Sequence, residues 1–148
     1  MNPKPRVFLD TSALFAGIWS ERGGGRLLLN LGEAGLVTLL VSGQVLEEIE
    51  RTVRAKAPET LPHLALLLHR SQVQVVEAPP RDRVAVCFDL TQHQNDALVI
   101  AAAWHAACDF FVTVDKRHFL DNSVLRAAAP FSMGAPGDCL AWLRAHWR

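Results

Sequence analysis

Four acidic segments could perform metal chemistry if the fold brings them together. They are Asp10, the group Glu47, Glu48 and Glu50, then Asp96 and Asp115. Carboxylates crowded into one site repel one another, and each raises the pKa of its neighbours. A fold keeps such a cluster ionised when cations neutralise it, so this set of residues indicates a divalent metal ion held by oxygen atoms.

Short apolar runs alternate with longer helical patterns along the chain. Runs that are apolar throughout suit parallel strands covered on both faces. The sequence predicts strands over 7–10, 37–42, 73–77 and 110–115, with a weaker fifth over 131–133. It predicts helices over 25–33, 44–56, 58–69, 81–90, 95–107 and 136–147. This alternation favours an α/β fold with a doubly wound parallel sheet of about five strands.

Boundary residues support these elements. Ser42 is expected to cap the helix that follows it, and Gly35 to lie just past a helix end. Pro136 suits the first turn of the last helix. Either Asn95 or Asp96 could cap the helix that begins there.

The predicted topology would bring the four acids to one edge. In a doubly wound sheet, the carboxyl ends of strands and the amino ends of helices share the edge where ligands bind. Asp10 closes the first strand and Asp115 closes the fourth. Asp96 lies in the first turn of the helix that leads into that fourth strand, and Glu48 lies near the start of the helix after the second strand.

Helical spacing does not settle which glutamate belongs to this edge. The buried stripe of the helix over 44–56 turns Glu47 away from the core. Glu48 and Glu50 both flank the stripe, and Glu48 lies nearer the helix start. Spacing therefore favours Glu48 and leaves Glu50 open. The stripe consists of Val45, Leu46, Ile49 and Val53.

Each acid also has an ordinary structural explanation. Asp96 could cap a helix, and neighbouring glutamates often form a solvated helix face. Asp10 could begin a turn or cap, but an unpaired charge at the end of a buried strand is costly, and the same holds for Asp115. The metal interpretation therefore depends on all four acids falling on the same edge.

The residues around these acids resemble the successive motifs of the PIN-domain nucleases. The similar segments are 7–14, 41–49, 96–103 and 111–115, within a resemblance that runs from Val7 to about Phe119. It is closest to a bacterial and archaeal group of toxin components of toxin-antitoxin pairs. The resemblance implies a three-layer sandwich with a central parallel sheet, dependence on Mg²⁺ or Mn²⁺, and hydrolysis of RNA phosphodiester bonds.

The resemblance also implies roles for individual residues. The family's acidic residues fall on Asp10, Glu48, Asp96 and Asp115, which selects Glu48 over Glu50 by analogy. Asp10, Asp96 and Asp115 would hold the metal, with Glu48 completing the acidic shell. The hydroxyl neighbours of the site would be Thr11, Ser12 and Thr113.

Two positions depart from the family pattern. Many members carry Asn where this chain has Ser12, although a hydroxyl can still hydrogen-bond a metal ligand or a water molecule. Many also carry an acid or amide near His118. Here the segment 116–118 is expected to be a basic loop, in which Lys116 and Arg117 could contact substrate phosphates.

Composition limits which other kinds of binding site and chemistry the chain can have. The formal net charge is zero, so any contact with nucleic acid must be local. The three cysteines are widely spaced and are expected to be buried, reduced thiols. The histidines lack zinc-site spacing, so structural or surface roles are expected for His93, His105 and His118.

The chain is expected to form a single PIN-like domain over residues 1–148 in the cytoplasm. Its apolar runs are far shorter than the ~20 residues that span a bilayer, and no signal-peptide pattern opens it. We interpret it as a metal-dependent endoribonuclease that acts on RNA, pairs with a small antitoxin and forms a homodimer.

Other functions are compatible with the same residues. They are a catalytically idle module that binds RNA or protein, a housekeeping RNA-processing nuclease, and a DNA nuclease of the same fold. The sequence leaves open the RNA target, the cleavage motif, the number of metal ions and whether DNA is also cut.

Overall fold

A computed structural model describes residues 3–147 of the protein. Within these residues five strands form one parallel sheet in the order β3-β2-β1-β4-β5. The strands are β1 (Arg6–Leu9), β2 (Thr38–Val41), β3 (Gln74–Val75), β4 (Phe110–Val112) and β5 (Ser132–Gly134). The predicted sheet is confirmed, with strand ends shifted by up to three residues.

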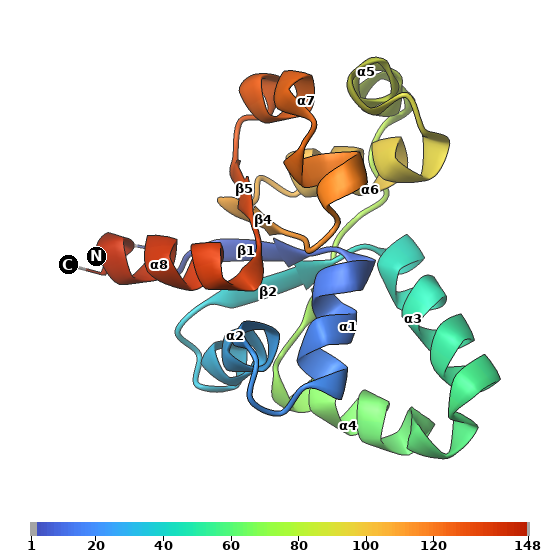
Figure 1. The fold of residues 1–148 in the computed structure, drawn as a ribbon, viewed down its shortest axis with the longest axis vertical. Helices are drawn as coiled ribbons and strands as arrows, with labels where there is room; N and C mark the ends of the chain where they lie inside the picture. The colour runs from blue at the N-terminus through green and yellow to red at the C-terminus, as the bar shows by residue number, and fades with distance from the viewer. Residues whose placement is uncertain (1–2, 148) are drawn as a thin grey trace.

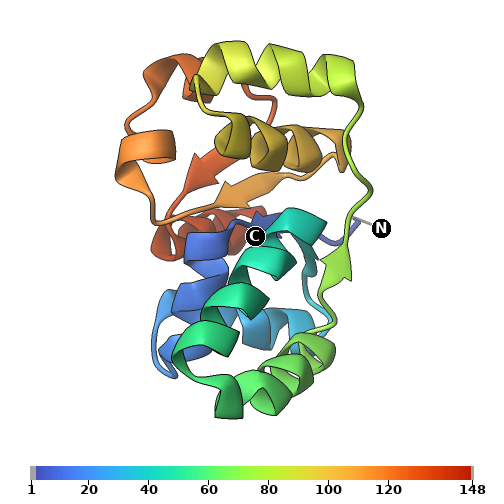
Figure 2. The ribbon, with the colours of Figure 1, turned by 90° about the vertical axis from the view of Figure 1, so that its right-hand side faces the viewer.

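Helices cover both faces of this sheet, which gives the three layers seen in Figure 1 and, after a quarter turn, in Figure 2. One side carries α1 (Thr11–Trp19), α2 (Gly24–Glu33), α3 (Gly43–Lys56) and α4 (Leu61–Arg70), with the 3₁₀ turn η1 (Pro58–Thr60) before α4. The other side carries α5 (Arg81–Thr91), α6 (Gln94–His105) and α7 (Ser123–Ala128). Finally, α8 (Pro136–His146) packs against α2, β4 and β5.

Three helical segments were not predicted. Helix α1 is apolar on nearly every side, so its residues show no helical periodicity. The short helix α7 spans six residues, too few for a clear pattern. The predicted loop over 116–118 was wrong, because these residues begin the π-helical turn η2 (Lys116–Leu120), in which the Asp115 side chain accepts a capping hydrogen bond from the His118 backbone N–H.

Most predicted boundary residues lie where expected. The Ser42 hydroxyl accepts a hydrogen bond from the Val45 N–H at 3.1 Å, and Gly35 ends α2 with a φ of 75°. Pro136 is the first residue of α8. The expected cap at Asn95 or Asp96 was wrong, because α6 begins one residue earlier and His93 occupies the N-cap position.

The chain order reverses between β1, the central strand, and its neighbour β4. The chain runs from β1 out to β2 and β3 on one side, then returns to place β4 and β5 on the other. Phe8 and Phe111 stack across this junction with ring centroids 5.5 Å apart. In open α/β sheets such a switch point leaves a crevice at the carboxyl ends of the strands, where ligands bind.

Within residues 3–147, none of the helices has the length and apolar character needed to cross a membrane. The cysteine prediction is confirmed, because Cys87, Cys108 and Cys139 are all buried and free. Burial raises the pKa of both Cys108 and Cys139 to about 12, so these thiols stay protonated at neutral pH.

Candidate active site

The four acids lie together at the switch point. Asp10 follows the last residue of β1, and Asp115 lies three residues after β4. Asp96 comes from the first turn of α6, and Glu48 from the second turn of α3. All four side chains line one pocket of about 250 Å³.

Hydroxyl groups hold the Asp10 carboxylate in place. Its Oδ1 atom accepts hydrogen bonds from the Ser12 hydroxyl at 2.7 Å and from the Ala13 N–H at 2.8 Å. Its Oδ2 atom accepts one from the Thr113 hydroxyl at 2.5 Å. Asp10 therefore caps α1 and is also tied to the end of β4, although only 4% of the residue is exposed.

The same two hydroxyls reach the loop after β4. The Ser12 oxygen accepts a hydrogen bond from the Val114 N–H, and the Thr113 oxygen accepts one from the Asp115 N–H, both at 3.0 Å. Because each hydroxyl donates to Asp10 while it accepts from this loop, the positions of Asp10 and Asp115 are coupled.

The surroundings of Asp10 disfavour its negative charge. Burial raises the pKa of Asp10, and the charge of Asp115 raises it further, while the three hydrogen bonds lower it in part. No lysine or arginine within residues 3–147 forms an ion pair with any of the four carboxylates. Hydrogen bonds alone therefore leave the ionised form of Asp10 disfavoured, and a cation in the pocket would stabilise it.

Of the three glutamates, Glu48 lies in the pocket. The Thr11 hydroxyl donates to its Oε2 atom at 2.7 Å, and the Gln44 amide donates to its Oε1 atom at 3.2 Å. Glu50 instead pairs with Arg54 at 2.6 Å along the exposed side of α3. Glu47 is exposed and lines a separate pocket beside β3.

Two polar residues that line the pocket were not predicted as site residues from the sequence. Gln44 and Asn95 both line it, and the Gln44 side-chain amide also donates to the backbone carbonyl of Asn95 at 3.3 Å. Gln44 precedes Glu48 by one helical turn, and this spacing could have indicated it. Lys116 and Arg117 are exposed on η2 and do not line the pocket.

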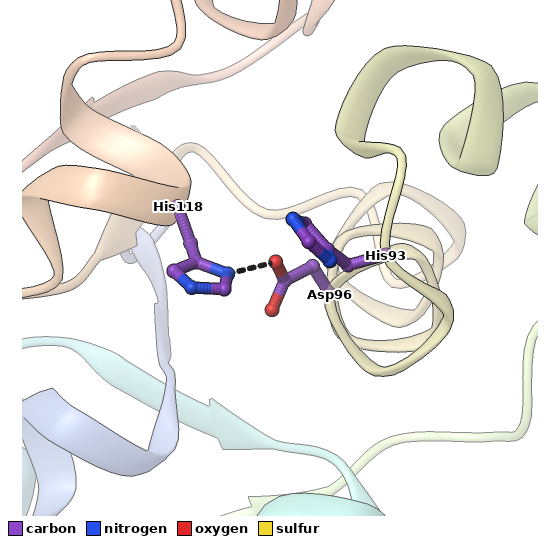
Figure 3. A group of neighbouring side chains, drawn as sticks. All are labelled: His93, Asp96 and His118. Atoms are coloured by element: carbon purple, nitrogen blue, oxygen red, sulfur yellow. Dashed lines mark hydrogen bonds and ion pairs between the residues drawn. The ribbon is translucent and has the colours of Figure 1, made fainter.

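Two histidines flank Asp96, as Figure 3 shows. The His118 Nδ1 atom lies 2.6 Å from the Asp96 Oδ2 atom, and this hydrogen bond, with the charge of Asp96, raises the pKa of His118. The His93 ring lies 4.8 Å from the His118 ring. Each histidine belongs to a different segment, so sequence spacing gave no sign that they would meet.

The donor set of the pocket suits a hard divalent cation. The four acids offer carboxylate oxygens, which are the ligands that Mg²⁺ and Mn²⁺ prefer. Asp10, Asp96 and Asp115 come from separate elements and converge on one small pocket, as a metal centre requires. The residues present therefore fit such an ion.

Comparison with known proteins agrees with this fold. The sequence profile of the PIN domain matches residues 6–117. The chain belongs to the PIN domain family. No curated protein sequence matches it.

Two solved structures share the fold. One is the crystal structure of VapBC2 from Rickettsia felis bound to a DNA fragment from their promoter, with a TM-score of 0.65 and 18% identity over 86% of this chain and 96% of that one. The other is PAE2754 from Pyrobaculum aerophilum, with a TM-score of 0.62 and 18% identity over 95% of this chain and 96% of that one. At this identity the likeness concerns the fold alone.

The environment of Asp10 predicts how a neutral replacement changes stability. Asp10→Asn should raise the free energy of unfolding of the metal-free protein at neutral pH, because it removes a disfavoured charge and keeps an oxygen for the Ser12 and Ala13 donors. Because the pKa of Asp10 is raised on folding, its protonated form contributes stability that is lost as the pH rises through that pKa. The gain in the free energy of unfolding from Asp10→Asn should therefore grow as the pH rises through the pKa of Asp10.

Urea unfolding in EDTA between pH 4 and pH 8 measures this difference. The matched control is Asp89→Asn, a neutral replacement of an exposed aspartate whose carboxylate accepts no hydrogen bond within residues 3–147; only its backbone carbonyl accepts one, from the Gln92 amide. A stability difference between Asp10→Asn and wild type that stays constant with pH would contradict the assignment of a buried, disfavoured charge.

Proposed function

We propose that the protein is a metal-dependent endoribonuclease and the toxin of a toxin-antitoxin pair. The observation that carries the nuclease proposal is the convergence of Asp10, Glu48, Asp96 and Asp115 in one pocket without a lysine or arginine partner among residues 3–147. Such a pocket attracts a divalent cation, and membership of the PIN domain family supports a phosphodiester substrate.

Asp10, Asp96 and Asp115 would hold Mg²⁺ or Mn²⁺, either directly or through water. Such an ion lowers the pKa of a bound water and stabilises charge on the scissile phosphate. The contribution of the chain is positioning: Thr113 and Ser12 fix the Asp10 carboxylate in one orientation, and Thr11 and Gln44 fix that of Glu48. A carboxylate that is already oriented loses less side-chain entropy when it binds a ligand.

RNA would approach through a local basic contact. The formal net charge of the chain is zero, so a broad positive surface does not attract nucleic acid. Lys116 and Arg117 are exposed on the turn that Asp115 caps, next to the pocket in sequence. We assign them to substrate phosphates, and the choice of RNA over DNA follows the family resemblance.

The toxin assignment is supported by the structural neighbour from Rickettsia felis, which is part of a VapBC2 assembly. By analogy, a small antitoxin would cover the acidic pocket of this protein and offer arginine or lysine to its carboxylates. A single domain, a homodimer and a cytoplasmic location belong to the same proposal.

The position of Glu48 predicts unequal effects of neutral replacements in α3. Glu48→Gln should lower kcat/KM for a single-stranded RNA by at least about tenfold, equivalent to about 1.4 kcal/mol, because the pocket loses one charge. Glu50→Gln and Glu47→Gln are matched controls on the same helix and should cleave at close to the wild-type rate. Equal losses in all three variants would show that Glu48 has no special role.

The toxin proposal predicts an effect on growth. Induced expression of the wild-type protein in a bacterial host should arrest growth, whereas Asp10→Asn, expressed to the same level on an immunoblot, should not, because it lacks a metal ligand. Coexpression of the protein encoded by a short adjacent reading frame should restore growth. Harmless expression of both proteins would favour a housekeeping nuclease or an idle binding module.

A further inference from the structure

Three residues beside the carboxylate pocket have the side chains and the spacing that could hold a second metal ion. His93, Asp96 and His118 each offer one ligand atom, and the three atoms lie within 4.8 Å of one another. Figure 3 shows the two imidazole rings on either side of the Asp96 carboxylate, with His93 and Asp96 coming from the start of α6 and His118 from η2. Neither ring is used in the proposed hydrolysis.

Local structure already holds two of these ligands in a favourable arrangement. His93 and Asp96 lie three positions apart at the start of α6, so their side chains lie on the same face of the first turn. The backbone N–H of His118 donates to the Asp115 Oδ1 atom at 3.0 Å. This hydrogen bond fixes the backbone of η2 where it faces the first turn of α6.

His93 is available as a ligand. It occupies the N-cap position of α6, but its side chain makes no capping hydrogen bond. Its ring forms no hydrogen bond with any residue in 3–147, and the residue is exposed. A histidine at an N-cap is a poor substitute for Ser, Thr, Asp or Asn, so helix capping does not account for this residue.

The chemistry of this set differs from that of the carboxylate pocket. Two imidazoles and one carboxylate form a nitrogen-rich set that Zn²⁺ and related transition ions prefer, whereas Mg²⁺ prefers oxygen ligands. Three protein ligands leave a fourth position for water, as in open zinc sites. The cysteines do not compete, since all three are buried and burial raises the pKa of each.

The distances allow one ion to engage all three residues after small side-chain rotations. Ligand atoms bonded to a tetrahedral zinc ion at about 2.1 Å lie about 3.4 Å apart. The pair His118 Nδ1 and Asp96 Oδ2, now at 2.6 Å, must open slightly, while the wider separations, all within 4.8 Å, must close. The exposed His93 ring can make the larger movement without losing core packing.

We propose that His93, Asp96 and His118 form a binding site for Zn²⁺ or a similar imidazole-preferring divalent ion, and that this ion inhibits the nuclease. The inhibition rests on the proposed function, because it follows from the shared residue Asp96. An ion bound by the two histidines withdraws the Asp96 carboxylate from the pocket that it lines with Asp10 and Asp115. The binding site itself does not depend on that function.

The test of binding uses Co²⁺ as a visible probe for Zn²⁺. The metal-free protein is titrated with Co²⁺ in excess Mg²⁺, which fills the oxygen-rich pocket, and Zn²⁺ is then added as a competitor. Wild type should develop the absorption of nitrogen-ligated Co²⁺ without a thiolate charge-transfer band, and Zn²⁺ should abolish it. His93→Ala and His118→Ala should each weaken binding by at least about tenfold, since losing even an outer-shell partner of a metal ligand costs that much.

The matched control is His105→Ala. His105 lies at the other end of α6, beside Glu77 at 3.6 Å, and has no contact with the cluster. This variant should bind Co²⁺ as wild type does. Unchanged binding in both His93→Ala and His118→Ala, or an equal loss in His105→Ala, would overturn the site.

The test of inhibition measures RNA cleavage in Mg²⁺ as Zn²⁺ is added. Wild type and His105→Ala should lose activity over the concentration range in which Zn²⁺ displaces Co²⁺, and His93→Ala should require at least about tenfold more Zn²⁺. Zinc that binds the histidines but leaves cleavage unchanged or increases it would overturn the inhibition. If wild type cleaves no RNA, the proposed function fails, while the Co²⁺ titration still decides the site.

Discussion

Asp10 is 4% exposed and follows a strand whose last three residues are buried, and its carboxylate has no lysine or arginine partner in residues 3–147. Such a group is stable only where donors surround it. Ser12, Ala13 and Thr113 supply three hydrogen bonds, and the hydroxyls of Ser12 and Thr113 each accept from the loop after β4. Placing Asp10 therefore determines how β1, α1 and the residues after β4 meet.

The aspartates combine structural and chemical roles. Asp10 caps α1 and Asp115 caps η2, so each orders a helix start as well as lining the pocket. Capping uses the Oδ1 atom of each carboxylate, and the Oδ2 atom of Asp10 accepts from the Thr113 hydroxyl. Asparagine retains a capping oxygen while removing the charge, whereas alanine would remove both. Neutral, isosteric replacements are therefore the variants that separate chemistry from folding.

Much of the fold could be predicted because its strands are short, apolar runs that end in distinctive residues. Asp10 and Asp115 were placed at strand ends, and topology then brought them together. Selecting Glu48 over Glu50 was different, since the helix stripe left both open and only the family resemblance selected Glu48. In the structure Thr11 donates to Glu48, whereas Glu50 pairs with Arg54. The meeting of His93 and His118 required the contact between α6 and η2, and no sequence pattern predicts that contact.

The central claim is that the four carboxylates bind a divalent cation needed to cleave RNA. The most direct measurement is cleavage of a single-stranded RNA by protein stripped with EDTA, before and after each metal is returned, with Asp10→Asn purified in parallel to exclude contaminating nucleases. We expect no cleavage in EDTA, recovery with Mg²⁺ or Mn²⁺, and no recovery with Ca²⁺, whose longer bonds and looser coordination suit in-line attack poorly. Cleavage at the full rate in EDTA, absent from the Asp10→Asn preparation, would contradict it.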